Sequence, residues 1–132
     1  MKREIGLWID HREAIIVTLE GDKEDIKRIE SDVEKRVRFS GAADTNGVGE
    51  DKRDRRIEGH LDHYYDAIIA QLGEATAVLI MGPGEAKTEF HKHMEKQLPL
   101  TKFVNVESAD KMTDAQIVAK VRRNFQLYEY TH

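Results

Sequence analysis

The start of the chain has large aliphatic residues at every second position, as short β-strands do. Ile5, Leu7 and Ile9 are separated by single residues, and the run Glu13–Glu20 is rich in β-branched side chains. A turn signal, Gly21-Asp22-Lys23, follows this run. Three further apolar positions mark a third, more polar strand: Ile26, Ile29 and Val33. The pattern predicts an antiparallel meander of three strands.

The apolar spacing then changes from two residues to three and four. One helical stripe contains Ile57, Leu61, Tyr64, Tyr65, Ile68, Ile69 and Leu72. Gly73 is a stop signal for this long amphipathic helix. The run Ala75–Met81 that follows is apolar almost throughout, which is typical of a central strand covered on both faces.

The last third of the chain predicts a helix, a short strand and a second helix. The first helix directs Ala86, Phe90, Met94 and Leu98 inward and ends at Pro99. The strand is Lys102–Glu107. The final helix opens with the capping box Thr113-Asp114-Ala115-Gln116, flanked by the staple pair Met112 and Ile117. Its apolar stripe is Ile117, Val121, Phe125 and Tyr128.

Three strands followed by a helix and then alternating strands and helices predict an α/β fold with a mixed sheet and helices on its faces. The order β-β-β-α-β-α-β-α is that of a ribonuclease H-like, translational-machinery-component architecture. We expect one domain over residues 1–132, with a mobile loop at about residues 39–51, where turn-forming residues crowd together without an apolar period.

Composition narrows the class of protein. The 132 residues are 39% hydrophobic and 35% charged, with a formal net charge of −4 and no cysteine, which excludes a disulfide framework. The N-terminus has no signal-peptide pattern, and no stretch approaches membrane-spanning length, so we expect a cytoplasmic protein without membrane contact. No motif calls for a cofactor.

The flanks of the predicted loop are basic within this acidic chain. We predict that they bind RNA phosphates, using Arg36, Arg38, Lys52, Arg53, Arg55 and Arg56. The alternative is a solvated charged segment, partly neutralised by its own acidic residues.

The strand that ends at Met81 runs through Gly82-Pro83-Gly84 into a helix. Helix N-termini attract anions, so Gly82, Gly84 and Lys87 form a candidate anion-binding junction. The alternative is structural: glycine for close packing or a positive φ, and lysine as a solvated charge.

Two further kinds of site have weaker support. His60 and His63 lie near Asp62 and Asp66, but a metal needs another ligand from elsewhere, and His91 and His93, two apart on a helix, do not share a face. We therefore assign no metal site. A nuclease would use Asp10 at the end of the first strand, with Glu58, Asp62 or Asp66 as a second acid, but the fourth strand offers no further carboxylate.

The segment Val78–Phe90 resembles the central domain of the archaeal and eukaryotic peptide-chain release factors and of the ribosome-rescue protein Pelota. It has the family pattern of an apolar strand, Gly-Pro-Gly, two residues, Lys87, two residues and an aromatic, Phe90. The opening hairpin, the basic loop, the His63-Tyr64-Tyr65 segment and the final strand and helix follow in the same order. The chain is similar to a small stand-alone prokaryotic relative of that domain.

One departure from the family bears on activity. Release factors carry a Gly-Gly-Gln tripeptide in the loop before the long helix, and it promotes hydrolysis of peptidyl-tRNA. Here the segment Ser40–Glu50 has no Gly-Gly pair and no glutamine. Pelota also lacks the tripeptide and acts on ribosomes. The resemblance therefore implies a non-catalytic protein that binds the ribosome or structured RNA. Two alternatives stay open: a small phosphate-handling enzyme or nuclease, and an interaction module without nucleic acid. Self-association also stays open.

Overall fold

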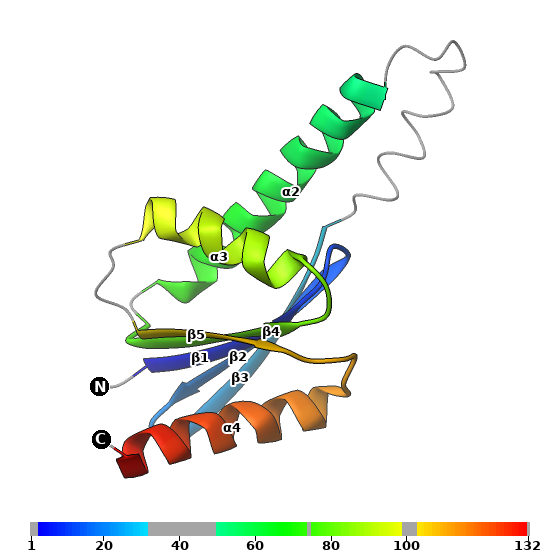
Figure 1. Ribbon diagram of the computed structural model, residues 1–132. Coiled ribbons are helices and arrows are strands. Elements are labelled where there is room, and N and C mark those ends of the chain that lie inside the picture. Colours follow the sequence, from blue (N-terminus) through cyan, green and yellow to red (C-terminus); the bar gives the residue numbers. More distant parts are fainter. Residues whose placement is uncertain (1–2, 32–49, 74, 99–102, 132) are drawn as a thin grey trace.

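The part of the chain that the computed structural model describes contains five strands and three helices (Figure 1). It describes the backbone of residues 3–31, 50–73, 75–98 and 103–131, and their side chains except at 50–60, 103 and 127–131. The elements are β1 (Arg3–Ile9), β2 (Glu13–Glu20), β3 (Lys23–Glu30), α2 (Glu50–Leu72), β4 (Ala77–Gly82), α3 (Ala86–Gln97), β5 (Phe103–Ser108) and α4 (Asp114–Thr131).

The strands form one mixed sheet in the order β3-β2-β1-β4-β5. Both hairpin pairings, β1 with β2 and β2 with β3, are antiparallel, whereas β4 is parallel to β1 and to β5. Parallel neighbours need a crossover, and here α2 and α3 supply the crossovers. The predicted α/β class and mixed sheet are confirmed.

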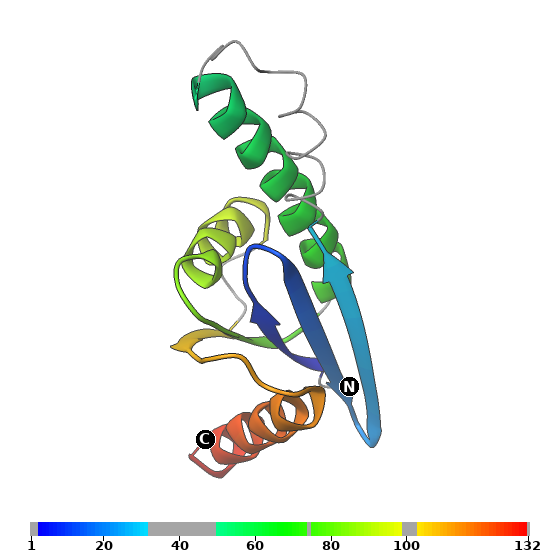
Figure 2. The ribbon, with the colours of Figure 1, turned by 90° about the vertical axis from the view of Figure 1, so that its right-hand side faces the viewer.

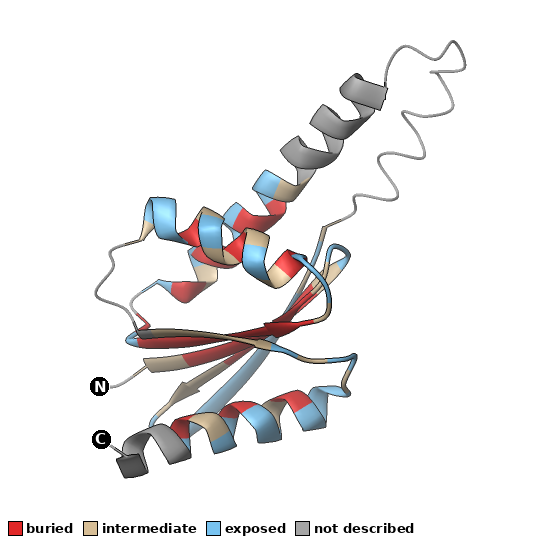
Figure 3. Cartoon of the chain, in the orientation of Figure 1, coloured by how far each residue is buried: buried red, intermediate tan, exposed pale blue. Residues whose placement is uncertain are grey.

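Helices cover both faces of the sheet (Figures 1 and 3). Helices α2 and α3 pack on one face, where Ile5, Leu7 and Ile16 meet Ile68 and Phe90 in one apolar cluster. Helix α4 packs on the other face through Ile117, Val121 and Phe125. Strand β4 is buried at every position because it lies between these two layers, as its continuous apolar run predicts.

The predicted start of α4 is confirmed in atomic detail. The Gln116 backbone N–H donates to Thr113 Oγ1 at 3.2 Å, and the Thr113 N–H donates to Gln116 Oε1 at 2.9 Å. This reciprocal pair is a capping box. Met112 and Ile117, the staple positions, belong to one apolar cluster.

Helix α2 begins earlier than the sequence pattern indicated. Glu50 and Asp51, placed in the predicted loop, are its first two residues, and positions 52, 53, 55 and 56 are helical rather than loop flanks. Acidic residues in a first turn favour the helix dipole, and Lys and Arg are good helix formers. Residues 39–49, Val33, Pro99 and Lys102 lie outside the described residues. None of the described helices is both long and apolar enough to cross a membrane.

Candidate functional site

The strands β1 and β4 end side by side at the carboxyl edge of the sheet, where ligand sites of open α/β sheets commonly lie. Three segments meet there: the β1–β2 turn, the β4–α3 junction and the middle of α2. We call this region the carboxyl edge. Of the residues that the sequence singled out, it contains Asp10, Gly82, Gly84 and Lys87.

Gly82 ends β4 where no side chain fits. A Cβ built on it would lie 2.0 Å from the carbonyl oxygen of Ile9 on β1, and the Gly82 carbonyl accepts the Ala109 N–H at 3.0 Å. The residue is glycine because two backbones approach closely here. The structural alternative therefore accounts for Gly82.

Gly84 and Lys87 form the turn that opens α3. Gly84 has φ +61°, the left-handed region that glycine adopts at little cost, and no atom lies near its added Cβ. The Lys87 ammonium folds back and donates to the Gly84 carbonyl oxygen. This bond uses one of the three N–H donors of the ammonium, so it neither requires nor excludes an anion at the junction. Anion binding here stays a prediction.

Asp10 is occupied by the β1–β2 turn. Its Oδ1 accepts the backbone N–H groups of Arg12 and Glu13, both at 2.8 Å, and its carbonyl accepts the Tyr64 hydroxyl at 3.0 Å. This is the local bonding by which aspartate fixes turns. The carboxylate that a nuclease would use thus organises a hairpin, and among the described residues no three His, Asp or Glu side chains gather to hold a metal.

Glu89, on the first turns of α3, joins the three segments of the carboxyl edge. Its Oε1 lies 3.2 Å from Nε2 of His11 and accepts the Tyr65 hydroxyl at 3.1 Å. The pKa of Tyr65 is raised mainly by burial and secondly by the Glu89 charge. The pKa of Tyr64 is also raised mainly by burial, and secondly by the Asp10 charge. Both phenols therefore remain protonated donors across the physiological range.

A polar seam connects α2 to α3 beside this edge. Asp66 Oδ1 lies 2.7 Å from His93 Nε2 and accepts the Gln97 amide at 2.8 Å, while Asp62 Oδ1 lies 3.8 Å from His93 Nδ1. The His93 and Gln97 hydrogen bonds lower the pKa of Asp66. Sequence reasoning named Asp62, Asp66 and His93 without joining them. The sequence contained a signal for this contact, because Asp62 and Asp66 on α2 are one helical turn apart, and so are His93 and Gln97 on α3.

Replacing Asp66 with Asn is expected to lower the free energy of unfolding by less than about 1 kcal/mol at neutral pH, because the group is half exposed. The pKa of Asp66 is lower in the folded state than in the unfolded state. The stabilisation that its carboxylate provides is therefore present above the unfolded-state pKa, and it is lost as the pH falls through the folded-state pKa. Urea titrations from pH 7 to acid should show the variant and wild type converging. Asp62→Asn is the matched control with a smaller effect, and a pH-independent difference would contradict the assignment.

Strand β3 also ends at the carboxyl edge. The Ser31 N–H donates to the Arg12 carbonyl at 2.8 Å, and its hydroxyl donates to the His11 carbonyl at 2.6 Å. Arg36 and Arg38 lie outside the described residues. Positions 52, 53, 55 and 56 lie in the first turns of α2, which extends well beyond the sheet (Figure 1).

Comparison with known proteins shows the fold. The Pelota protein of Thermoplasma acidophilum superposes with a TM-score of 0.54 at 16% identity, over 90% of this chain and 31% of that one. Archaeoglobus fulgidus Pelota gives 0.56 at 14% identity, over 92% and 31%. The archaeal translation termination factor aRF1 gives 0.48 at 15% identity, over 97% and 40%. The chain therefore spans less than a third of the Pelota proteins, whose middle-domain fold it resembles. No protein-family model matches the sequence, and no curated protein matches it significantly.

Proposed function

We propose that the protein binds the ribosome or structured RNA, as a non-catalytic component of translation, through the first turns of α2 and the segment before them. The fold likeness to Pelota supports a role in translation. The observation that carries the proposal is the position of the basic residues on α2.

Helix α2 is 23 residues long, about 35 Å at 1.5 Å per residue. Leu61 is the first of its described side chains that packs on the core. The backbone of the turns before Leu61 extends beyond the sheet as an arm (Figure 1).

Charge is divided around this arm. At about 100° per residue, positions 52, 53, 55 and 56 share one half of the helix, and the acidic positions 50, 51, 54 and 58 share the other. The basic half continues the side of α2 on which His63, Ala67 and Ala70 are exposed, opposite the core residues. Basic residues at positions opposite the core positions of the helix suit the binding of a phosphate backbone, which releases counterions.

Replacing Arg53, Arg55 and Arg56 with Ala is expected to weaken co-sedimentation with ribosomal subunits. The slope of log K against log salt should fall by roughly one unit for each phosphate that is no longer neutralised. The matched control replaces Lys111, Lys120 and Arg123, near and on α4, and removes as many positive charges from the opposite face. Equal weakening in both triple variants, or unchanged binding in the first, would refute the proposed surface.

The protein is also expected not to release peptides. The segment Ser40–Glu50 lacks the Gly-Gly-Gln tripeptide that release factors use. On programmed ribosomes carrying labelled peptidyl-tRNA, hydrolysis should stay at the level measured without added factor. Turnover above that background would overturn the non-catalytic assignment.

A further inference from the structure

Strand β3 is an edge of the sheet, and no described residue covers its outer side. It is the terminal strand of the sheet order, seven of its eight residues are exposed, and no other described element lies beside that side (Figure 2). Among the described residues, Ile26 is the exposed large hydrophobic side chain, at 42%. An open edge presents a row of backbone donors and acceptors that another strand can pair with.

The pairing of β3 with β2 determines which backbone groups remain on that outer side. The Ser31 N–H donates to the Arg12 carbonyl, so these two residues form a hydrogen-bonded pair. Because hydrogen-bonded pairs alternate along an antiparallel ladder, the odd-numbered residues of β3 are the ones that are hydrogen-bonded to β2. The N–H and C=O groups of Glu24, Ile26 and Arg28 therefore point outward.

The geometry points to a second copy of this chain as the partner of β3, paired antiparallel about a two-fold axis at Ile26. In this register Ile26 faces Ile26 of the second copy. Asp25 faces Lys27, and Glu24 faces Arg28; symmetry makes each ion pair twice. Opposite charges directly across an antiparallel pair are stabilising. An isologous contact of this kind closes on itself as a dimer.

The charges select this register over its neighbours. A two-fold axis perpendicular to the sheet pairs odd positions with odd and even with even, so the nearest alternatives move the axis by one residue. With the axis at Lys27, that residue faces its own copy and Glu24 faces Glu30. With the axis at Asp25, that residue faces its own copy and Lys23 faces Lys27. Both alternatives oppose like charges between residues of the strand, which is destabilising. With the axis at Ile26 the charged pairs within β3 are all of opposite sign, and the like-charged partner of Glu30 is Asp22, which lies in the turn before the strand.

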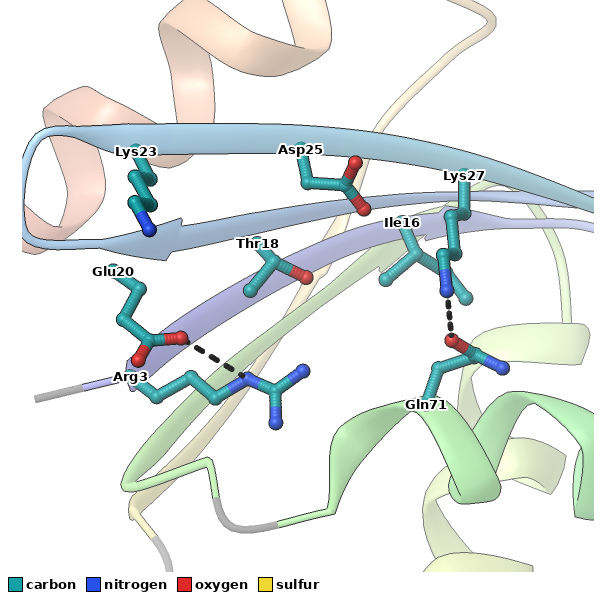
Figure 4. Close-up of a pocket in the computed structure, with 8 residues that line it drawn as sticks. All are labelled: Arg3, Ile16, Thr18, Glu20, Lys23, Asp25, Lys27 and Gln71. Atoms are coloured by element: carbon teal, nitrogen blue, oxygen red, sulfur yellow. Dashed lines mark hydrogen bonds and ion pairs between the residues drawn. The ribbon is translucent and has the colours of Figure 1, made fainter.

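The face of β3 that carries Lys23, Asp25 and Lys27 is open to a partner. These side chains stand along the strand and line a hollow of about 190 Å³ near the end of α2 (Figure 4). Lys27 donates to Gln71 of α2 at 2.9 Å, but neither Lys23 nor Asp25 makes a side-chain hydrogen bond or ion pair within the described part. Asp25 thus has an unused charge at the position where Lys27 of the second copy would lie.

On the opposite face of β3, ion pairs with α4 hold the charged side chains at the same edge of the sheet. Arg122 of α4 binds Glu24, and Arg28 Nη2 lies 2.9 Å from Asp114 Oδ1. Glu24 and Arg28 thus already have ion-pair partners within the chain, so the Glu24 and Arg28 pairs contribute less to this register than the Asp25 and Lys27 pairs. The Asp25 and Lys27 pair is the cleaner one to test, because it does not involve α4.

A charge swap in the full chain tests the register without RNA, and so independently of the proposed ribosome binding. Sedimentation velocity over a concentration series should show a monomer–dimer equilibrium for the wild type. Asp25→Lys and Lys27→Asp should each weaken dimerisation by about tenfold or more, since two opposite-charge pairs become two like-charge pairs. The double variant should restore it. Lys92→Asp, an exposed site on α3, is the control with the same charge change and no effect.

A backbone variant gives a second measurement. Ile26→Pro removes an N–H that points to the open edge rather than to β2, a position where an edge strand tolerates proline. The variant should stay folded by circular dichroism and sediment as a monomer. A wild type that remains monomeric would overturn the inference, leaving the charges as protection against edge pairing. A dimer that survives both single swaps and Ile26→Pro, or a double swap that fails to restore dimerisation, would overturn it as well.

Discussion

Replacing Gly82 with Val is expected to destabilise the protein by about 3 kcal/mol or more, at the upper end of what overpacking usually costs. The added Cβ would lie 2.0 Å from the Ile9 carbonyl oxygen, and that oxygen belongs to the backbone of a central strand. A rotamer change cannot relieve such a clash, so β1 and β4 must separate at their carboxyl ends. Chemical denaturation monitored by circular dichroism measures the destabilisation.

Gly84, two residues further along, provides the matched control. Its φ is +61° and no atom lies within 4 Å of an added Cβ, so Gly84→Ala costs only the left-handed backbone, about 1–2 kcal/mol. Asn tolerates that region better, and Gly84→Asn should cost less still. Equal destabilisation at Gly82 and Gly84 would show that the close approach of β1 and β4 is not the reason for Gly82.

A phosphate titration distinguishes between the packing and anion-binding explanations of the β4–α3 junction. If the turn holds an anion, phosphate should raise the melting temperature of the wild type with mass-action concentration dependence, and Lys87→Ala should reduce that shift. Because close packing accounts for Gly82 and a positive φ accounts for Gly84, we expect little or no shift.

Replacing Gly6 with Val is expected to be the other severe change, with destabilisation of similar size. Gly6 lies on β1 beneath α4, and an added Cβ would lie 2.2 Å and 2.7 Å from the two methyl groups of Val121. Helix α4 would have to lift from the sheet, exposing Phe125 and Trp8, whose indole N–H donates to the Asp110 carbonyl at 3.0 Å. Urea denaturation should report the lower stability, and tryptophan fluorescence should report a more exposed Trp8.

A double-mutant cycle tests the stated cause of the Gly6 effect. Gly6→Ala alone should be destabilising, whereas Gly6→Ala with Val121→Ala should cost less than the sum of the single variants. The reason is that truncating Val121 removes the two closest atoms and leaves a contact at 3.0 Å. Strict additivity would mean that the space between β1 and α4 is not limiting.

The local patterns of the sequence were sufficient for most elements and for the sheet class. Two-residue spacing and β-branched residues predicted the hairpin strands, because successive side chains of a strand point to opposite faces of the sheet. The capping box of α4 depends on Thr113 and Gln116 alone, so it too is a local property. The start of α2 was placed too late, because the residues from Glu50 to Arg56 have no apolar period to distinguish helix from loop.

Local patterns did not predict the contacts of the candidate site, because these contacts join residues that are distant in the chain. Asp66 and His93 were visible as separate polar positions, but only the packing of α2 on α3 brings them within 2.7 Å. Likewise, the sequence marked Asp10 as a possible catalytic acid, and the folded turn assigns its carboxylate to two backbone N–H groups.

By itself, the sequence determined the strands, the helices, their order and the basic character of the residues around the predicted loop, since these follow from propensity, periodicity and composition. The tertiary structure alone decided which glycines have no room for a side chain, which polar groups bind one another and which strand has an open edge. Those properties depend on distances between segments far apart in the chain. Gly6 shows this most plainly: nothing in its neighbours along the chain predicts that Val121 lies above it.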